Sequence, residues 1–257
     1  MTIGIIGSGN VANALAIAFA KNNVVVSAII ARNEITGNKL AQKAKASFYK
    51  FPINKLPKAD VFLICVSDNA LQTVIESLPR SSMLIAHTAG SVGLNLLAGK
   101  YKNAGVFYPL QTLKFANKNF KKIPICIEAS NQVSENKLLK LASSISNKNI
   151  KLNSQQRLHL HLAAVITNNF TNHLYAQAHA YLEAHELPFQ LLHPLIEKTA
   201  EMVFNTPPNK LQTGPAVRYD ANTIKKQIAL LDDNEALKKL YQLFTASIQK
   251  MNPKKQS

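Results

Sequence analysis

The sequence has no long apolar run, little cysteine and few acidic residues. Hydrophobic residues make up 47% of its 257 residues, yet no uninterrupted apolar stretch approaches the ~20 residues that a membrane-spanning helix needs. The short apolar run at residues 3–6 follows no basic segment, so it lacks the form of a signal peptide. We therefore expect a cytoplasmic globular protein that does not bind a membrane.

The two cysteines, Cys65 and Cys126, both lie in apolar, strand-like runs. This number and placement fit neither a disulfide scaffold nor a cysteine-based metal site. Free cysteine is also among the most frequently buried residue types. The sequence thus predicts two buried, reduced thiols and no bound metal ion.

Acidic residues number 14 against 30 Lys and Arg, which gives a formal charge of +16. Such a balance occurs in nucleic-acid-binding proteins. Here the excess is nearly all lysine, spread along the chain without interleaved aromatic residues and densest at residues 250–255. We therefore expect no nucleic-acid partner, but a basic field that attracts anionic substrates and a phosphorylated cofactor.

The most informative segment that is present is a glycine turn between an apolar run at residues 3–6 and a helical pattern at 11–21. It consists of Gly7, Ser8, Gly9, Asn10 and Val11, followed by Ala12. The first glycine of such a turn permits the tight bend, the second lets the backbone approach a diphosphate, and the small third residue lets the helix pack closely. The helix N-terminus then offers N–H groups and a positive dipole end to the anion. The segment predicts a dinucleotide cofactor.

The residues after the second predicted strand, at 24–31, indicate which dinucleotide binds. Folds that prefer NAD place Asp or Glu at this strand tip to hold the ribose diol. Here Arg32 and Asn33 follow instead, and a guanidinium clamps a phosphate well. We expect NADP(H), with a solvated surface Arg32 as the alternative. A second part of the rim is expected from the end of another strand, at Val66, Ser67 and Asp68.

Apolar strands and helical patterns alternate through the first half of the chain. Strands are predicted at 2–6, 24–31, 61–66, 83–87, 104–107 and 123–128, and helices at 11–21, 34–45, 71–78 and 132–146. This alternation predicts an α/β fold with a largely parallel, doubly wound sheet, which is a Rossmann domain over residues 1–152.

Strand signals stop near Asn149. Residues 155–185 contain neither Gly nor Pro and repeat apolar residues at helical spacing, which predicts one long helix. Further helices are predicted at 189–204, 223–231 and 234–251. An all-α domain, expected over residues 153–257, therefore follows the nucleotide-binding domain.

Polar side chains after two further strands are candidates for the chemistry. His87 begins a polar segment at the end of an apolar strand, where it either orients a substrate or lies buried in a turn. Gln111 follows Tyr108 and Pro109 in a second turn, and the proline alone does not account for the glutamine. We expect Gln111 to contact the substrate.

The predicted long helix carries an unusual polar face. His161, Asn168, Asn169 and Asn172 recur at steps of three and four, and asparagine is a poor helix former. Positions that break a local rule are often functional. We expect the three asparagines to bind a ligand and His161 to give a proton to a carbonyl oxygen as hydride arrives at its carbon.

A loop near residue 214 is the last candidate. Thr213 and Gly214 lie beside a proline, in a loop that exposes backbone N–H groups. Arg218 is expected to pair with a substrate carboxylate. The alternative is a structural pair between Arg218 and Asp220.

Together these segments resemble a known family. The motifs are the glycine turn, C-V-S-D-N-A from Cys65, H-T-A-G-S from His87, F-Y-P-L-Q-T from Phe107, L-H-L-A-A-V from Leu160, N-N-F-T-N-H from Asn168 and Q-T-G-P-A from Gln212. They resemble a Rossmann-like family whose helical C-terminal domain is labelled as of unknown function (DUF2520-type). The resemblance covers nearly the whole chain. It implies kinship with pyrroline-5-carboxylate reductases and the 6-phosphogluconate dehydrogenase superfamily, and a homodimer formed through the helical domain.

Some members of this family resemble an alternative bacterial ketopantoate reductase. The better-known ketopantoate reductases use a helix Lys as acid and an Asn further along; the comparable places here hold His161 and Asn169, and no Lys occurs between Lys151 and Lys198. The acid is therefore His161, His87 or a water held by asparagine. The resemblance implies NADPH-dependent reduction of a small 2-oxo acid, 2-dehydropantoate to pantoate. The alternatives are a pyrroline-5-carboxylate-type imine reductase and a non-enzymatic NADPH-sensing module.

Overall fold

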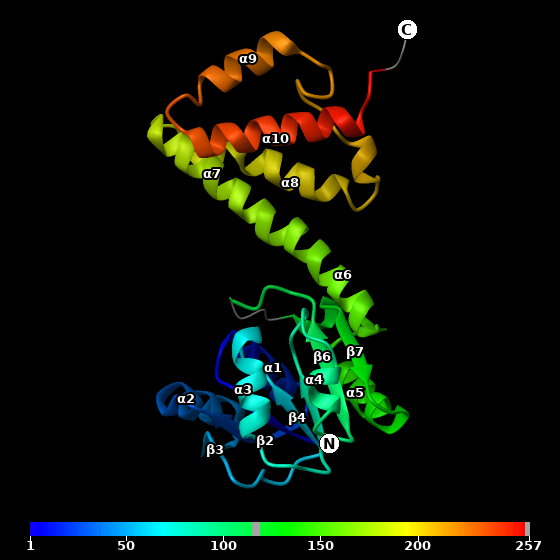
Figure 1. The fold of residues 1–257 in the computed structure, drawn as a ribbon. Helices are drawn as coiled ribbons and strands as arrows, with labels where there is room; N and C mark the ends of the chain where they lie inside the picture. Colours follow the sequence, from blue (N-terminus) through cyan, green and yellow to red (C-terminus); the bar gives the residue numbers. More distant parts are fainter. Residues whose placement is uncertain (115–118, 255–257) are drawn as a thin grey trace. The chain divides into compact units, whose positions relative to one another are not determined.

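The computed structural model describes residues 1–114 and 119–254. The chain divides into two compact units, residues 1–168 and 169–257 (Figure 1). The first unit is built on one sheet and the second is helical. The domain boundary expected after residue 152 lies directly after the last strand of the sheet. That residues 1–152 and 153–257 form separate domains stays a proposal.

The first unit contains an eight-stranded sheet in the order β3-β2-β1-β4-β5-β6-β7-β8. Its strands are β1 (Thr2–Ile6), β2 (Val25–Ala31), β3 (Ser47–Lys50), β4 (Val61–Ile64), β5 (Leu84–His87), β6 (Ala104–Pro109), β7 (Ile125–Ala129) and β8 (Asn149–Lys151). All neighbouring strands run parallel except β6 and β7, which are antiparallel. The reversal of strand order beside β1 is the doubly wound topology that the alternation predicted.

Helices cover both faces of this sheet. Helices α1 (Asn10–Lys21), α2 (Glu34–Ala44) and α5 (Gln132–Ile145) contribute to one apolar core. Helices α3 (Asp68–Ser77) and α4 (Asn95–Ala98) contribute to the other. The central strands β1, β4 and β5 are buried almost throughout, as expected of parallel strands covered on both sides. The predicted fold class is confirmed.

Three short elements were not predicted. Strand β3 lies at the sheet edge and is half-exposed, β8 has three residues, and α4 has four. None is long enough to develop a clear hydrophobic period. A 3₁₀ turn, η1 (Phe120–Lys122), precedes β7.

The stretch predicted as one long helix contains a π-helical segment. It comprises α6 (Ser154–Ala164), the π-helix η2 (Val165–Phe170) and α7 (Thr171–Ala184). A π-helix is wider than an α-helix, so the 3.6-residue period behind the expected polar face does not apply through it. Helical residues run without a gap from Ser154 to Ala184, as the sequence predicted, but the π-helical segment was not predicted, because π turns leave no distinct hydrophobic pattern.

The second unit continues with further helices: η3 (Phe189–Leu192), α8 (His193–Met202), η4 (Pro208–Lys210), α9 (Ala221–Ala229) and α10 (Glu235–Met251). The predicted helices agree with these within a few residues, except that the one expected at 189–204 begins as a 3₁₀ turn. Among its described residues, this unit buries the hydrophobic side chains of Ala216 and Leu231. The unit therefore has little apolar core of its own.

Both cysteines are free and buried, as predicted. In the described part of the chain, no helix has the length and apolar character needed to cross a membrane. No cluster of potential metal ligands is found among those same residues.

Candidate functional site

The glycine turn joins β1 to α1 at the carboxyl edge of the sheet. Gly7 has a φ of +119°, and a Cβ there would lie 2.3 Å from the carbonyl oxygen of Cys65, so only glycine fits. A Cβ added at Gly9 would meet no atom within 4 Å. The turn is therefore packed against the residues that follow β4 at Gly7 and open at Gly9, where the diphosphate of a dinucleotide would approach the backbone.

The first turn of α1 leaves its N–H groups available. Gly9 is the N-cap of this helix and provides no side-chain cap. The Asn13 amide donates to the carbonyl oxygens of Ser8 and Gly9, at 2.9 and 3.0 Å, which holds the turn in place. Because helix N-terminal N–H groups and the helix dipole favour an anion, this geometry fits a diphosphate.

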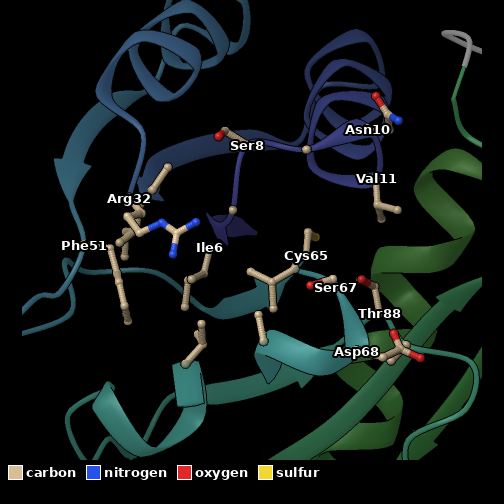
Figure 2. A pocket seen from close by; sticks show the side chains of 18 of the residues that line it. Ile6, Ser8, Asn10, Val11, Arg32, Phe51, Cys65, Ser67, Asp68 and Thr88 are labelled. Carbon is tan, nitrogen blue, oxygen red and sulfur yellow. The ribbon is translucent and has the colours of Figure 1, made fainter. Parts of the chain in front are cut away.

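Arg32 and Asn33 follow β2 beside the turn and line the same cavity (Figure 2). The Asn33 side chain caps α2 by accepting from the Thr36 N–H, and the Thr36 hydroxyl lies 2.7 Å from the Ser8 hydroxyl. The nearest acid along the chain, Glu34, pairs with Lys50 at 2.5 Å. The exposed guanidinium of Arg32 and the hydroxyls beside it thus form a polar corner suited to a phosphate.

A second rim of the cavity follows β4. Val66, Ser67 and Asp68 line the cavity, and Asp68 accepts a short hydrogen bond from Ser91. Ser67 is the N-cap of α3 but forms no side-chain cap there. A second helix N-terminus therefore borders the cavity.

These segments enclose one cavity of about 810 Å³. Its lining includes the predicted cofactor residues Gly7, Ser8, Gly9, Asn10, Val11, Arg32, Asn33, Val66, Ser67 and Asp68. Phe51, Thr88 and Gly90 also line it, and most of these side chains surround the space in Figure 2. Phe51 follows the edge strand β3, whose short, half-exposed run has no clear sequence pattern, so Phe51 was not predicted.

Tyr108 and His161 line the same cavity and contact each other. The Tyr108 hydroxyl lies 3.0 Å from His161 Nδ1, and the two rings meet edge to face at 5.9 Å. Burial raises the pKa of Tyr108 to about 12. The sequence indicated His161 and the turn after Tyr108, but not Tyr108 itself, because the pairing joins residues far apart in the chain.

The structure does not bring His87 to this cavity. Its side chain is fully buried, and its Nδ1 accepts from the Ala89 N–H at 3.2 Å. Burial, reinforced by the charge of Arg157, lowers the pKa of His87 to about 4. This histidine is therefore neutral and closes a turn, which is the buried alternative weighed above.

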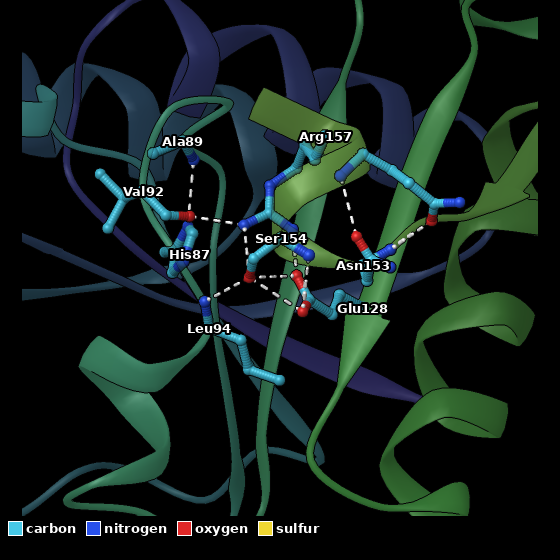
Figure 3. Close-up of polar contacts among 9 residues, drawn as sticks. His87, Ala89, Val92, Leu94, Glu128, Asn153, Ser154 and Arg157 are labelled. Atoms are coloured by element: carbon cyan, nitrogen blue, oxygen red, sulfur yellow. Dashed lines mark hydrogen bonds and ion pairs between the residues drawn. The ribbon is translucent and has the colours of Figure 1, made fainter. Parts of the chain in front are cut away.

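Arg157 anchors α6 to β7 and to the loop after β5 (Figure 3). It is 1% exposed, forms an ion pair with Glu128 on β7, and donates to the Val92 carbonyl at 2.5 Å. Ser154, at the start of α6, donates to the same carboxylate at 2.9 Å. Because Arg157 lies one helical turn before His161, this network fixes the helix face that carries the histidine. A lone arginine in a predicted helix gave no sign of this role.

Among the predicted substrate residues, Asn168 and Gln111 lie in the first unit. The Asn168 amide donates to the Thr112 hydroxyl at 2.9 Å, so it lies beside the turn that contains Gln111. The Gln111 side chain accepts from the Thr112 N–H and is exposed.

The remaining predicted residues belong to the second unit. Asn169, Asn172, Thr213 and Arg218 are exposed, and Gly214 has a φ of +104° in its loop. The charge of Arg218 contributes to lowering the pKa of Asp220, after the hydrogen bonds from Thr223. Asp220 caps α9. Roles for these residues in substrate binding stay proposals.

The fold is a Rossmann-like one, and comparison with known proteins identifies the family. Residues 1–110 match the model of a Rossmann-like domain, and residues 123–248 match that of a domain of unknown function, DUF2520. A crystal structure from Bacteroides fragilis, assigned as an NADP oxidoreductase, is 38% identical with a TM-score of 0.88, covering 97% of this chain and 98% of that one. The chain belongs to this Rossmann-like, DUF2520 family.

More distant structures share the fold. An imine reductase from Myxococcus stipitatus, solved with NADP+, has a TM-score of 0.71 at 13% identity, covering 97% of this chain and 93% of that one. A pyrroline-5-carboxylate reductase from Coxiella burnetii has a TM-score of 0.55 at 14% identity, covering 98% of each chain. No curated protein matches the chain. The resemblance drawn from the motifs is confirmed.

Proposed function

We propose that this protein is an NADP(H)-dependent oxidoreductase that reduces a small 2-oxo acid, 2-dehydropantoate, to pantoate in pantothenate biosynthesis. One observation carries the proposal: a single cavity is lined by an open glycine turn, by Arg32, and by the Tyr108–His161 pair. It thus combines a diphosphate site, a phosphate-binding cation and groups that exchange protons.

NADP(H) is the cofactor. The backbone of the glycine turn holds the diphosphate, and Arg32 with Asn33 holds the 2′-phosphate. The assignment of the 38% identical Bacteroides fragilis protein as an NADP oxidoreductase supports this choice. When bound, NADPH supplies a hydride to the electrophilic carbon of the substrate.

The chain's own residues supply the proton and orient the substrate. His161 is the proton source for the oxygen that becomes an alcohol, and a donor placed where charge develops is a large catalytic term. The side-chain amides of Gln111 and Asn168 and the Thr112 hydroxyl border the turn after Tyr108. Asn169, Asn172, Thr213, Gly214 and Arg218 complete the proposed substrate set on the evidence of the sequence.

The protein acts as a cytoplasmic homodimer formed through the helical unit. Large apolar side chains of this unit are exposed, including Leu191 at 67%, Phe204 at 83% and Leu243 at 66%. A unit that buries so little apolar surface cannot offset the entropy of folding alone. A second copy of the chain is proposed to bury these exposed apolar side chains in a dimer interface.

The test is oxidation of NADPH, followed by the absorbance of the reduced nicotinamide, with ketopantoate and, separately, with pyrroline-5-carboxylate. The proposal predicts turnover of ketopantoate and formation of pantoate, with NADPH preferred over NADH. No turnover at millimolar ketopantoate contradicts it, and turnover of the imine alone assigns the cavity to imine reduction.

A further inference from the structure

The proposed reaction needs a defined path for its proton, and the Tyr108–His161 contact offers one. We propose that Tyr108 is the catalytic residue that hands the proton to the substrate oxygen, and that His161 replaces this proton through Nδ1. The inference rests on the proposed function and adds to it a role for Tyr108.

The two side chains come from different elements that are each firmly held. Tyr108 lies on β6, where it pairs with Cys126 of β7 in the sheet. His161 lies on α6, one turn after the buried Arg157 and its partner Glu128. The distance of 3.0 Å between the hydroxyl and Nδ1 is thus set by the sheet and by an anchored helix.

Because Gly90 has no side chain, it leaves room for the Tyr108 and His161 rings. A Cβ at this position would lie 2.7 Å from both His161 Nδ1 and Tyr108 Cζ. Gly90 lines the cavity together with both side chains. The pair is therefore part of the cavity wall, and the loop after β5 packs against it without a side chain between.

The order of the two groups follows from which atom faces which. Nδ1 of His161 is hydrogen-bonded to the Tyr108 hydroxyl, so a proton that leaves Nδ1 passes to the phenol oxygen. Burial raises the pKa of Tyr108 to about 12, with Cys126 and Asp68 also raising it and Arg157 opposing them. The phenol is therefore protonated at neutral pH and available as a donor.

The step balances without a further reactant. As the carbonyl carbon receives hydride, the C=O π electrons move to oxygen, which forms a bond to the Tyr108 proton. The Tyr108 O–H bond breaks while the phenol oxygen receives the proton of the protonated His161 from Nδ1. The tyrosine ends unchanged, the imidazole ends neutral, and it regains its proton from water. One hydride and one proton make one alcohol.

The first experiment compares Tyr108→Phe with Tyr49→Phe, a tyrosine of the edge strand β3 outside the cavity lining. We expect Tyr108→Phe to lower kcat by roughly 100-fold or more, the size of a general acid–base contribution, while NADPH binding and KM change little. Tyr49→Phe is expected to match the wild type. An unchanged kcat in Tyr108→Phe overturns the relay.

The pH dependence of kcat separates a relay from a merely structural contact. His161→Gln removes the imidazole that returns the proton to Tyr108, so its kcat is expected to depend on pH differently from that of the wild type, while part of the rate remains through the phenol. A pH profile of kcat that is unchanged in His161→Gln overturns the relay.

Failure of the relay and failure of the proposed function are distinguishable. If wild-type protein reduces ketopantoate and Tyr108→Phe does so equally well, the relay is wrong and the function stands. If wild-type protein oxidises NADPH with neither ketopantoate nor pyrroline-5-carboxylate, the function is overturned, and the relay with it.

Discussion

Arg157 of α6 forms a buried ion pair with Glu128 of β7, with side-chain exposures of 1% and 16%. Removing one partner of such a pair leaves an uncompensated buried charge. We expect Arg157→Met to lower the free energy of unfolding by about 3 to 5 kcal/mol, as measured by urea denaturation. Lys50→Met breaks the exposed Glu34–Lys50 pair and should change it by less than about 1 kcal/mol. Equal effects of the two substitutions contradict this account of the anchor.

Arg32 is predicted to select NADP(H). Arg32→Gln should weaken NADPH binding by roughly 10- to 100-fold, the range expected for a hydrogen bond to a charged group, and leave NADH binding nearly unchanged. Arg80→Gln removes the same charge from an exposed position outside the cavity lining and serves as the control. Calorimetric titration measures both cofactors. If Arg32→Gln weakens NADPH and NADH equally, Arg32 does not read the 2′-phosphate.

Buried His87 predicts a specific loss of stability in acid. Its pKa is lowered by burial from 6.5 to about 4, so below pH 6.5 the unfolded chain binds a proton that the folded chain does not. The contribution of His87 to the free energy of unfolding therefore has its full value above pH 6.5. It decreases as pH falls toward 4, by about 3 kcal/mol in all. Urea denaturation between pH 7 and pH 4 measures this loss.

His87→Leu should remove that part of the pH dependence, whatever its pH-independent effect on stability. His159→Gln, at an exposed position, should retain the full dependence. An identical pH slope in His87→Leu and wild type would show that His87 does not titrate as its burial requires.

The helical unit is predicted to form the dimer interface. Leu243→Asp places a charge on a side chain that is 66% exposed in one chain and should shift the protein from dimer to monomer in analytical ultracentrifugation. Ile35→Asp alters an equally apolar side chain, 81% exposed on α2 of the other unit, and should leave the dimer intact. A monomeric wild type contradicts the proposed homodimer.

Local sequence patterns predicted those parts of the site that are contiguous in the chain. The glycine turn and the polar residues after β2 and β4 line the cavity, because parallel strands bring their carboxyl ends to one edge. The loss of strand signals near Asn149 predicted the helical second part of the chain. Neither pattern indicated β3, whose short, half-exposed residues carry no clear period, and so Phe51 was missed.

Contacts between residues far apart in the chain could not be predicted from local sequence patterns. Tyr108 and His161 are 53 residues apart, and Arg157 lies 65 residues from the Val92 carbonyl that it binds. Such pairings depend on how β6, the loop after β5 and α6 pack together. The π-helix was missed for a different reason: its wider turn leaves a hydrophobic pattern that resembles an ordinary helix.

The central claim is that the turn at Gly7 and Gly9 holds the diphosphate of NADP(H), and calorimetric titration of NADPH into Gly9→Ala tests it most directly. A Cβ at Gly9 meets no protein atom within 4 Å, so thermal stability should be unchanged, while NADPH affinity should fall at least roughly tenfold, about 1.4 kcal/mol. Gly99→Ala, where a Cβ lies 3.6 Å from the Asn95 carbonyl oxygen, is the matched control and should bind NADPH normally. A Gly9→Ala protein that binds NADPH as tightly as the wild type would contradict the account.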